Sequence, residues 1–79
     1  MAEQTILIAE DDPDIRDGVR ILLSGEGYHI IEAENGTRAL EVFRPEVDLV
    51  ILDIMMPGMS GLRVCEELRK LSTVPILFL

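Results

Sequence analysis

Leu49-Val50-Ile51-Leu52-Asp53 is a run of apolar residues that ends in an acid. Apolar residues without alternation are typical of a parallel strand buried on both faces. A second such run, Ile6-Leu7-Ile8-Ala9, leads directly into Glu10-Asp11-Asp12. Open α/β sheets bind their ligands at the carboxyl ends of the strands, so two neighbouring strands would bring these acids together. Clustered carboxylates repel one another, and we therefore expect a cation at this point.

Strand-like and helix-like segments alternate along the chain. Asp12-Pro13 predicts a helix start, because Asp is a good N-cap and Pro suits the first helical position. Asn35-Gly36 indicates a turn, and Pro45 ends a helix near Arg44. The sequence predicts strands at residues 5–9, 28–33, 48–53 and 74–79, and helices at 13–24, around 39–43 and from 60 or 61 to 71. This βαβαβαβ order predicts a parallel sheet with right-handed crossovers and helices on both faces.

Apolar side chains at helical spacing indicate which faces of the helices point inward. In the first helix these residues are Ile15, Val19, Leu22 and Leu23, and in the third they are Leu62, Cys65, Leu68 and Leu71. Aromatic residues are scarce, so we expect aliphatic side chains and Met to fill the core.

The composition describes one small acidic domain. The 79 residues carry seven Lys and Arg against fifteen Asp and Glu, a net charge of −8. We therefore expect no direct DNA contact from this segment, because phosphate binding needs clustered positive charge. The single Cys65 excludes an internal disulfide and favours a reducing compartment. Residues 1–4 show no signal-peptide pattern and no apolar run is long enough to span a membrane, so we expect a cytoplasmic protein without a membrane partner.

The acidic cluster, the order of the elements and two segments together indicate a known family. The segments are Ile6-Leu7-Ile8-Ala9-Glu10-Asp11-Asp12 and Asp48-Leu49-Val50-Ile51-Leu52-Asp53-Ile54-Met55-Met56-Pro57-Gly58-Met59-Ser60-Gly61, and Val74-Pro75-Ile76-Leu77-Phe78-Leu79 supports them. Over its whole length the chain resembles the receiver domain of bacterial two-component response regulators, closest to the subfamily whose receiver precedes a winged-helix DNA-binding domain. The resemblance implies a flavodoxin-like, three-layer α/β/α fold with an incomplete parallel sheet of strand order 2-1-3-4.

The resemblance also assigns the site residues. Asp53 would be the phosphoacceptor, receiving a phosphoryl group from a sensor histidine kinase. Mg²⁺, or Mn²⁺ in its place, would be bound directly by Asp11 and Asp53, through water by Glu10, and by the backbone carbonyl of Met55. Pro57, Gly58 and Gly61 would shape the loop that follows Asp53. Asp12 is interpreted as the N-cap of the first helix and Asp14 as a first-turn acid, because negative charge favours a helix N-terminus.

The chain departs from the family pattern at its carboxyl end. A complete receiver carries a Thr or Ser after its fourth strand and a Lys after its fifth, and neither switch residue is present in residues 1–79. Lys70 falls on the third helix and does not replace the Lys. We therefore interpret residues 1–79 as the N-terminal part of a receiver, without strand 5, helices 4 and 5 or an effector domain, and expect this chain alone to be incompetent in signalling.

Three other functions were weighed against the phosphoacceptor. An aspartyl phosphohydrolase of the haloacid-dehalogenase type needs a second Asp two positions after the first, where Met55 stands, so we do not expect an enzyme. A calcium loop fails because Arg16 occupies a ligand position after Asp12 and Asp14. The alternative that stays open is a structural or binding module that self-associates, as a homodimer or a domain-swapped oligomer, without phosphosignalling.

Overall fold

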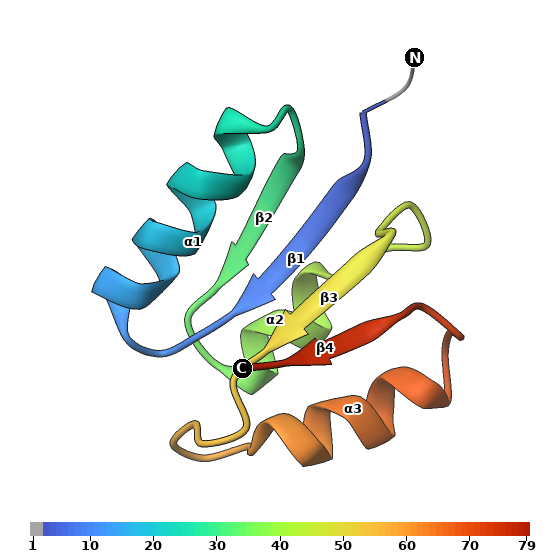
Figure 1. The fold of residues 1–79 in the computed structure, drawn as a ribbon. Helices are drawn as coiled ribbons and strands as arrows, with labels where there is room; N and C mark the ends of the chain where they lie inside the picture. The colour runs from blue at the N-terminus through green and yellow to red at the C-terminus, as the bar shows by residue number, and fades with distance from the viewer. Residues whose placement is uncertain (1–2) are drawn as a thin grey trace.

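The computed structural model describes residues 3–79 as a parallel sheet with helices on both faces (Figure 1). Its elements are β1 (Thr5–Ala9), α1 (Pro13–Gly25), β2 (His29–Ala33), α2 (Gly36–Val42), β3 (Leu49–Leu52), α3 (Gly61–Arg69) and β4 (Ile76–Phe78). The predicted alternation of strands and helices is confirmed, and most boundaries fall within one or two residues of those predicted. The sheet order is β2-β1-β3-β4, as expected.

The parallel register places the ends of β1 and β3 side by side. Ala9, the last residue of β1, lies opposite Leu52, the last residue of β3. On its other side Ala9 lies opposite Ala33 at the end of β2. The segments that follow these three strands therefore leave the sheet at the same edge, which is where the sequence places its acids.

The two faces of the sheet are covered unequally. Helices α2 and α3 pack on the face that carries Leu7, Val50 and Leu52, and this side holds most of the buried apolar residues. Helix α1 alone covers the other face, over Ile6, Ile8 and Ile51. The three layers that the resemblance implied are therefore present. One outer layer consists of α2 and α3, and the other consists of α1.

The inward face predicted for α3 was partly wrong. Leu62 and Leu71 are 55% and 69% exposed, whereas Val64 and Leu68 are fully buried and Cys65 is half-buried. The real stripe begins at Gly61, which is also buried. The sequence pattern started the buried face of α3 one residue too late. Gly61 lies on that face but has no side chain to reveal it, so the pattern began at Leu62, the next bulky apolar residue.

The predicted face of α1 was also too wide. Val19 and Leu23 pack against the sheet, whereas Ile15 is 50% and Leu22 is 68% exposed. A single helix lying over one half of a sheet buries only the stripe directly beneath it, and residues on its flank stay open to solvent.

Within residues 3–79, the edge strand β4 pairs only with β3 and is largely open. Leu77 and Phe78 in this strand, and Leu79 directly after it, are 55%, 38% and 51% exposed. Over residues 3–79, no helix is both long and apolar enough to cross a membrane.

Candidate metal and phosphoacceptor site

Backbone hydrogen bonds of the sheet fix the starting points of two of the acids. The Asp53 N–H donates to the carbonyl of Ala9 at 2.9 Å, so the β1–β3 ladder continues one residue past β3. The Glu10 N–H donates to the carbonyl of Ala33 at 3.1 Å, which extends the β1–β2 ladder in the same way. The main chain of both acids is therefore hydrogen-bonded to the end of a neighbouring strand.

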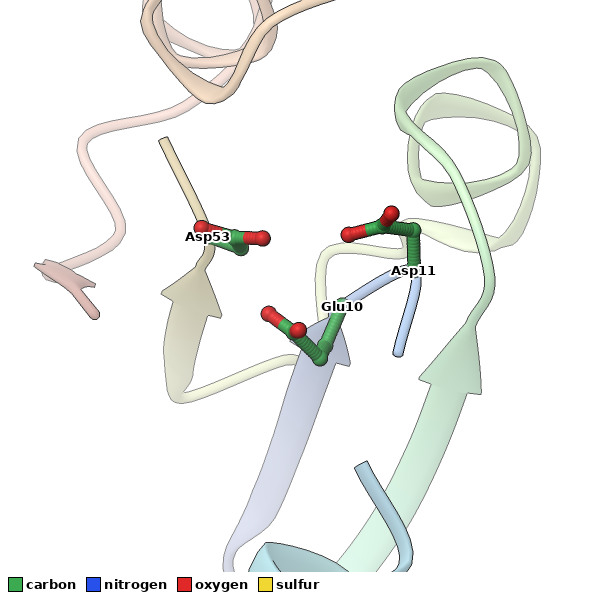
Figure 2. A group of neighbouring side chains, drawn as sticks. All are labelled: Glu10, Asp11 and Asp53. Carbon is green, nitrogen blue, oxygen red and sulfur yellow. The ribbon is translucent and has the colours of Figure 1, made fainter. Parts of the chain in front are cut away.

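The side chains of Glu10, Asp11 and Asp53 converge on one space (Figure 2). Each contributes a carboxylate oxygen, and these oxygens all lie within 4.8 Å of one another. Glu10 is buried, Asp53 is half-buried and Asp11 is exposed, so the cluster is closed towards the sheet and open to solvent beyond it. The structure thus brings together the three carboxylates that the sequence proposed.

Glu10 is a buried carboxyl group that faces two further acids. Burial raises the pKa of Glu10 from 4.5 to about 7, and a hydrogen bond and charge repulsion from Asp53, with a further contribution from Asp11, act in the same direction. The N–H of Asp12, which donates to Glu10 Oε1 at 3.3 Å, opposes this rise only in part. Without a cation, the cluster therefore tends to retain a proton on Glu10 near neutral pH.

The loop after β3 bends back onto Asp53. The Met55 N–H donates to Asp53 Oδ1 at 3.1 Å, which fixes the orientation of that carboxyl group. Gly58 has a φ of 78°, a conformation that residues with a Cβ rarely adopt. Pro57 is exposed in this loop. The Met55 carbonyl as a ligand of the metal stays a prediction.

Gly61, the first residue of α3, lies directly against the main chain of Asp53. Its N–H donates to the Ile54 carbonyl at 2.9 Å, which brings the first turn of α3 against the end of β3. A Cβ built on Gly61 would overlap with the carbonyl oxygen of Asp53 and would lie 2.9 Å from the carbonyl carbon of the same residue. Glycine at this position therefore lets α3 pack directly behind Asp53.

The neighbouring acids Asp12 and Asp14 lie outside the cluster. Asp12 Oδ1 accepts from the N–H groups of Asp14 and Ile15 at 2.9 and 3.4 Å, so Asp12 is the N-cap of α1. Asp14 is the acidic residue of the first helical turn. Their positions agree with the predicted roles as capping and dipole-compensating residues rather than ligands.

The donor set suits a hard divalent cation. Three carboxylates offer only oxygen ligands, which is the preference of Mg²⁺, and a bound cation would offset the charge repulsion that Asp53 and Asp11 add to the effect of burial on the pKa of Glu10. An open depression of about 510 Å³ adjoins Asp11 and runs between the start of α2 and the β3–α3 loop, so the site is accessible from solution.

The sequence analysis missed one residue that contacts this site. Arg16 Nη1 donates to the carbonyl oxygen of Glu10 at 2.8 Å, and its Nε lies 3.3 Å from Glu32 Oε1 on β2. A signal was present in the sequence, since Glu32 directly follows the apolar pair Ile30-Ile31 in β2 and two arginines stand four residues apart on α1.

Comparisons with known proteins agree with this geometry. Residues 6–79 match the model of the response regulator receiver domain. The transcriptional regulatory protein YrkP of Bacillus subtilis, whose function is uncharacterised, is 53% identical over 74 residues, which cover 94% of this chain and 32% of YrkP. The chain thus spans about a third of the length of the curated relatives it matches.

Solved structures show the same fold. The response regulator TrrA of Thermotoga maritima, crystallised with Mg²⁺ and BeF, aligns with a TM-score of 0.86 and 48% identity over 92% of this chain and 65% of TrrA. A complex of TrrA with the histidine kinase ThkA aligns with a TM-score of 0.85 and 47% identity over 95% of this chain and 66% of the matched chain. From the matched residues, the sheet order and the acids at its carboxyl edge, we conclude that this chain belongs to the family of response regulator receiver domains.

Proposed function

We propose that Asp53 accepts a phosphoryl group from the phosphohistidine of a sensor histidine kinase. The observation that carries this proposal is the convergence of three carboxylates within 4.8 Å at the carboxyl edge of the sheet, with Asp53 half-buried but reachable. The crystallisation of TrrA with Mg²⁺ and BeF, and with a kinase, supports the same chemistry in a similar domain.

In the proposed step, one oxygen of Asp53 forms a bond to phosphorus while the bond from phosphorus to the donor imidazole nitrogen breaks. The imidazole keeps the electron pair of that bond and takes up a proton, and Asp53 becomes an acyl phosphate. The Met55 N–H, which donates to Oδ1 of Asp53, orients the carboxyl group for this attack. A bound Mg²⁺ supplies the positive charge that lets an anionic phosphoryl group approach three carboxylates.

The remaining residues hold the ion and the loop. We propose that Asp11 and Asp53 bind Mg²⁺ or Mn²⁺ directly, that Glu10 binds through water and that the Met55 carbonyl completes the set. Pro57, Gly58 and Gly61 keep the loop close to Asp53. The domain would not be an enzyme with a separate substrate. It would act in the cytoplasm as a phosphorylated switch, and DNA would be contacted only by an effector domain of a longer protein.

Binding of fluoroberyllate in the presence of Mg²⁺, followed by amide chemical shifts, tests the role of Asp53. We expect the wild type to bind and Asp53→Asn not to bind. Asp48→Asn is a matched control, since Asp48 accepts a hydrogen bond from the Thr5 N–H at the opposite end of the sheet. Binding by Asp53→Asn at wild-type strength would contradict the proposal.

The exposed edge of β4 favours a second function, self-association. The residues concerned are Leu77, Phe78 and Leu79. They combine exposed apolar surface with backbone groups that, in the described part of the chain, have no neighbouring strand on one side. Such an edge pairs readily with another strand. We propose a two-fold dimer through β4, or an exchange of elements between chains. Light scattering over a concentration series should show association that Leu77→Lys abolishes, and a wild-type monomer at high micromolar concentration would refute it.

A further inference from the structure

Arg16 connects the first turn of α1 to two separate parts of the sheet. Its Nη1 donates to the carbonyl oxygen of Glu10 at 2.8 Å, and its Nε lies 3.3 Å from Glu32 Oε1 on β2. The side chain is only 18% exposed, so this fork is held in a partly desolvated position. Charge-assisted hydrogen bonds of this kind are among the stronger ones in proteins.

The carbonyl that Arg16 holds belongs to the peptide unit between Glu10 and Asp11. The N–H of Glu10, directly after β1, donates to the last residue of β2, and the backbone that follows leads into α1. The orientation of this peptide therefore decides where the Asp11 side chain starts. Arg16 holds that orientation through its hydrogen bond to the main-chain carbonyl.

The junction needs such a restraint because it is strongly acidic. Glu10, Asp11, Asp12 and Asp14 stand within five consecutive positions, and their charges repel one another. Within residues 3–79, the ion-pair partner of Arg16 is Glu32, and its contact with Glu10 is to the main chain. The guanidinium thus counters the repulsion without occupying any carboxylate oxygen of the three-acid cluster.

We infer that Arg16 is a positioning residue for the acidic site: by holding the Glu10 carbonyl, it keeps Glu10 and Asp11 in the arrangement that binds a divalent cation. The inference rests on the proposed function, since it assumes that the cluster binds such a cation. Residues that orient metal ligands from outside typically change metal affinity by about 10- to 100-fold when replaced.

Arg20 provides a matched control on the same helix. It lies one turn after Arg16, and its Nε pairs with the other oxygen of Glu32 at 3.5 Å. Its ion-pair partners within the described chain are Glu32 and Asp17, and the side chain is 38% exposed. Replacing either arginine by Met removes one ion pair to Glu32 and keeps a good helix former, but only Arg16→Met removes the contact with Glu10.

Mn²⁺ titration of the complete chain, read by paramagnetic broadening, measures the effect. We expect Arg16→Met to weaken Mn²⁺ binding about tenfold, and Arg20→Met to change it by less than about twofold, as for an exposed ion pair. The amide signals of Asp11 and Asp12 should also shift in metal-free Arg16→Met and not in Arg20→Met. The urea midpoints of the two variants should be similar, which separates positioning from a general loss of stability.

Equal Mn²⁺ affinities for the two arginine variants would overturn the inference. If Arg16→Met does not fold, Arg16→Lys decides, because one ammonium group cannot serve Glu10 and Glu32 in the fixed geometry of the guanidinium fork. A reduced affinity in Arg16→Lys then supports the inference and an unchanged affinity overturns it. Asp11→Asn distinguishes a failure of this inference from a failure of the proposed metal site. If Asp11→Asn binds Mn²⁺ like the wild type, the proposed site itself is wrong.

Discussion

The two sides of the acidic site are held in place by different physical means. On the β3–α3 side, Asp53 is fixed by backbone packing, since Gly61 lies directly against its carbonyl group. On the β1–α1 side, Glu10 and Asp11 depend on polar side chains, with Arg16 on the Glu10 carbonyl and Asp12 capping the helix that follows. Close packing of backbone against backbone leaves no space for adjustment, whereas hydrogen bonds from long side chains can be replaced in part.

This contrast suits a division of labour. The residue proposed to form a covalent bond sits on the rigid side, where a fixed position favours reaction. The two residues proposed only to hold an ion sit on the adjustable side, where small movements are tolerated. Four experiments test or refine this comparison.

Replacing a proposed ligand should have the largest effect. Asp11→Asn removes one negative charge and one strong oxygen donor from the cluster, and we expect Mn²⁺ affinity to fall by at least about 100-fold, beyond the range of outer-shell changes. Asp14→Asn is the control, because Asp14 lies in the first turn of α1 and outside the cluster. Similar losses in both variants would mean that binding reflects the general acidity of the segment.

The pH dependence of stability should report on Glu10. Burial and Asp53 raise the pKa of Glu10 to about 7 in the folded chain, whereas the ordinary value of 4.5 applies to the unfolded chain. Between these values the folded state binds the proton and the unfolded state does not, so this group makes stability fall as pH rises from about 4.5 to about 7 and leaves it level above that.

Urea unfolding from pH 5 to pH 8 measures this slope. Glu10→Gln should flatten it, because the amide does not titrate. Saturating Mg²⁺ should also reduce the decline, since a cation favours the ionised carboxylate. A wild-type profile that rises over this range in the absence of metal and matches that of Glu10→Gln would show that Glu10 is not the group in question.

Substitution on the rigid side should disturb the loop more than the helices. In Gly61→Ala the new methyl group overlaps with the Asp53 carbonyl, and overpacking of this kind costs about 1–3 kcal/mol. We expect weaker Mn²⁺ binding with nearly unchanged helical circular dichroism. Gly18→Ala is the control: nothing lies within 4 Å of a Cβ built on Gly18, and Ala in the middle of α1 should stabilise the chain by about 0.5–1 kcal/mol. Gross unfolding of Gly61→Ala would contradict the assignment of this loop.

Much of the fold could be predicted from the sequence because it depends on local patterns. Buried strands such as Leu49–Leu52 are continuous apolar runs, and Asp12-Pro13 specifies the start of α1 through capping. The strand order and the meeting of Glu10 with Asp53 followed from the family resemblance and from the rule that ligands bind at strand ends. These features require no knowledge of side-chain packing.

The features that escaped prediction depend on contacts between different elements of the fold. Leu62 and Leu71 were placed inward because apolar periodicity cannot register a glycine as a contact residue, although Gly61 sets the phase of α3. Arg16 was missed because its two contacts leave no periodic pattern in the sequence. One is with the main-chain carbonyl of Glu10, and the other is with Glu32, sixteen residues away on β2. Periodicity carries information on burial, whereas such polar contacts become visible only when the elements are assembled.

The smallest expected effect comes from the helix caps, which the two sides of the site share. Asp12 caps α1, and Ser60 Oγ accepts the N–H of Arg63 at 3.2 Å to cap α3. Asp12→Ala and Ser60→Ala should each lower the free energy of unfolding by about 1 kcal/mol, as caps generally do. At low ionic strength, Asp12→Ala should lower the free energy of unfolding slightly more than Ser60→Ala does, because the charge of Asp12 also interacts favourably with the positive end of the helix dipole. Urea unfolding at two salt concentrations measures both terms. If Ser60→Ala instead cost several kcal/mol more than Asp12→Ala, the rigidity of the Asp53 side would depend on its cap, and the role given to Gly61 would have to be reduced accordingly.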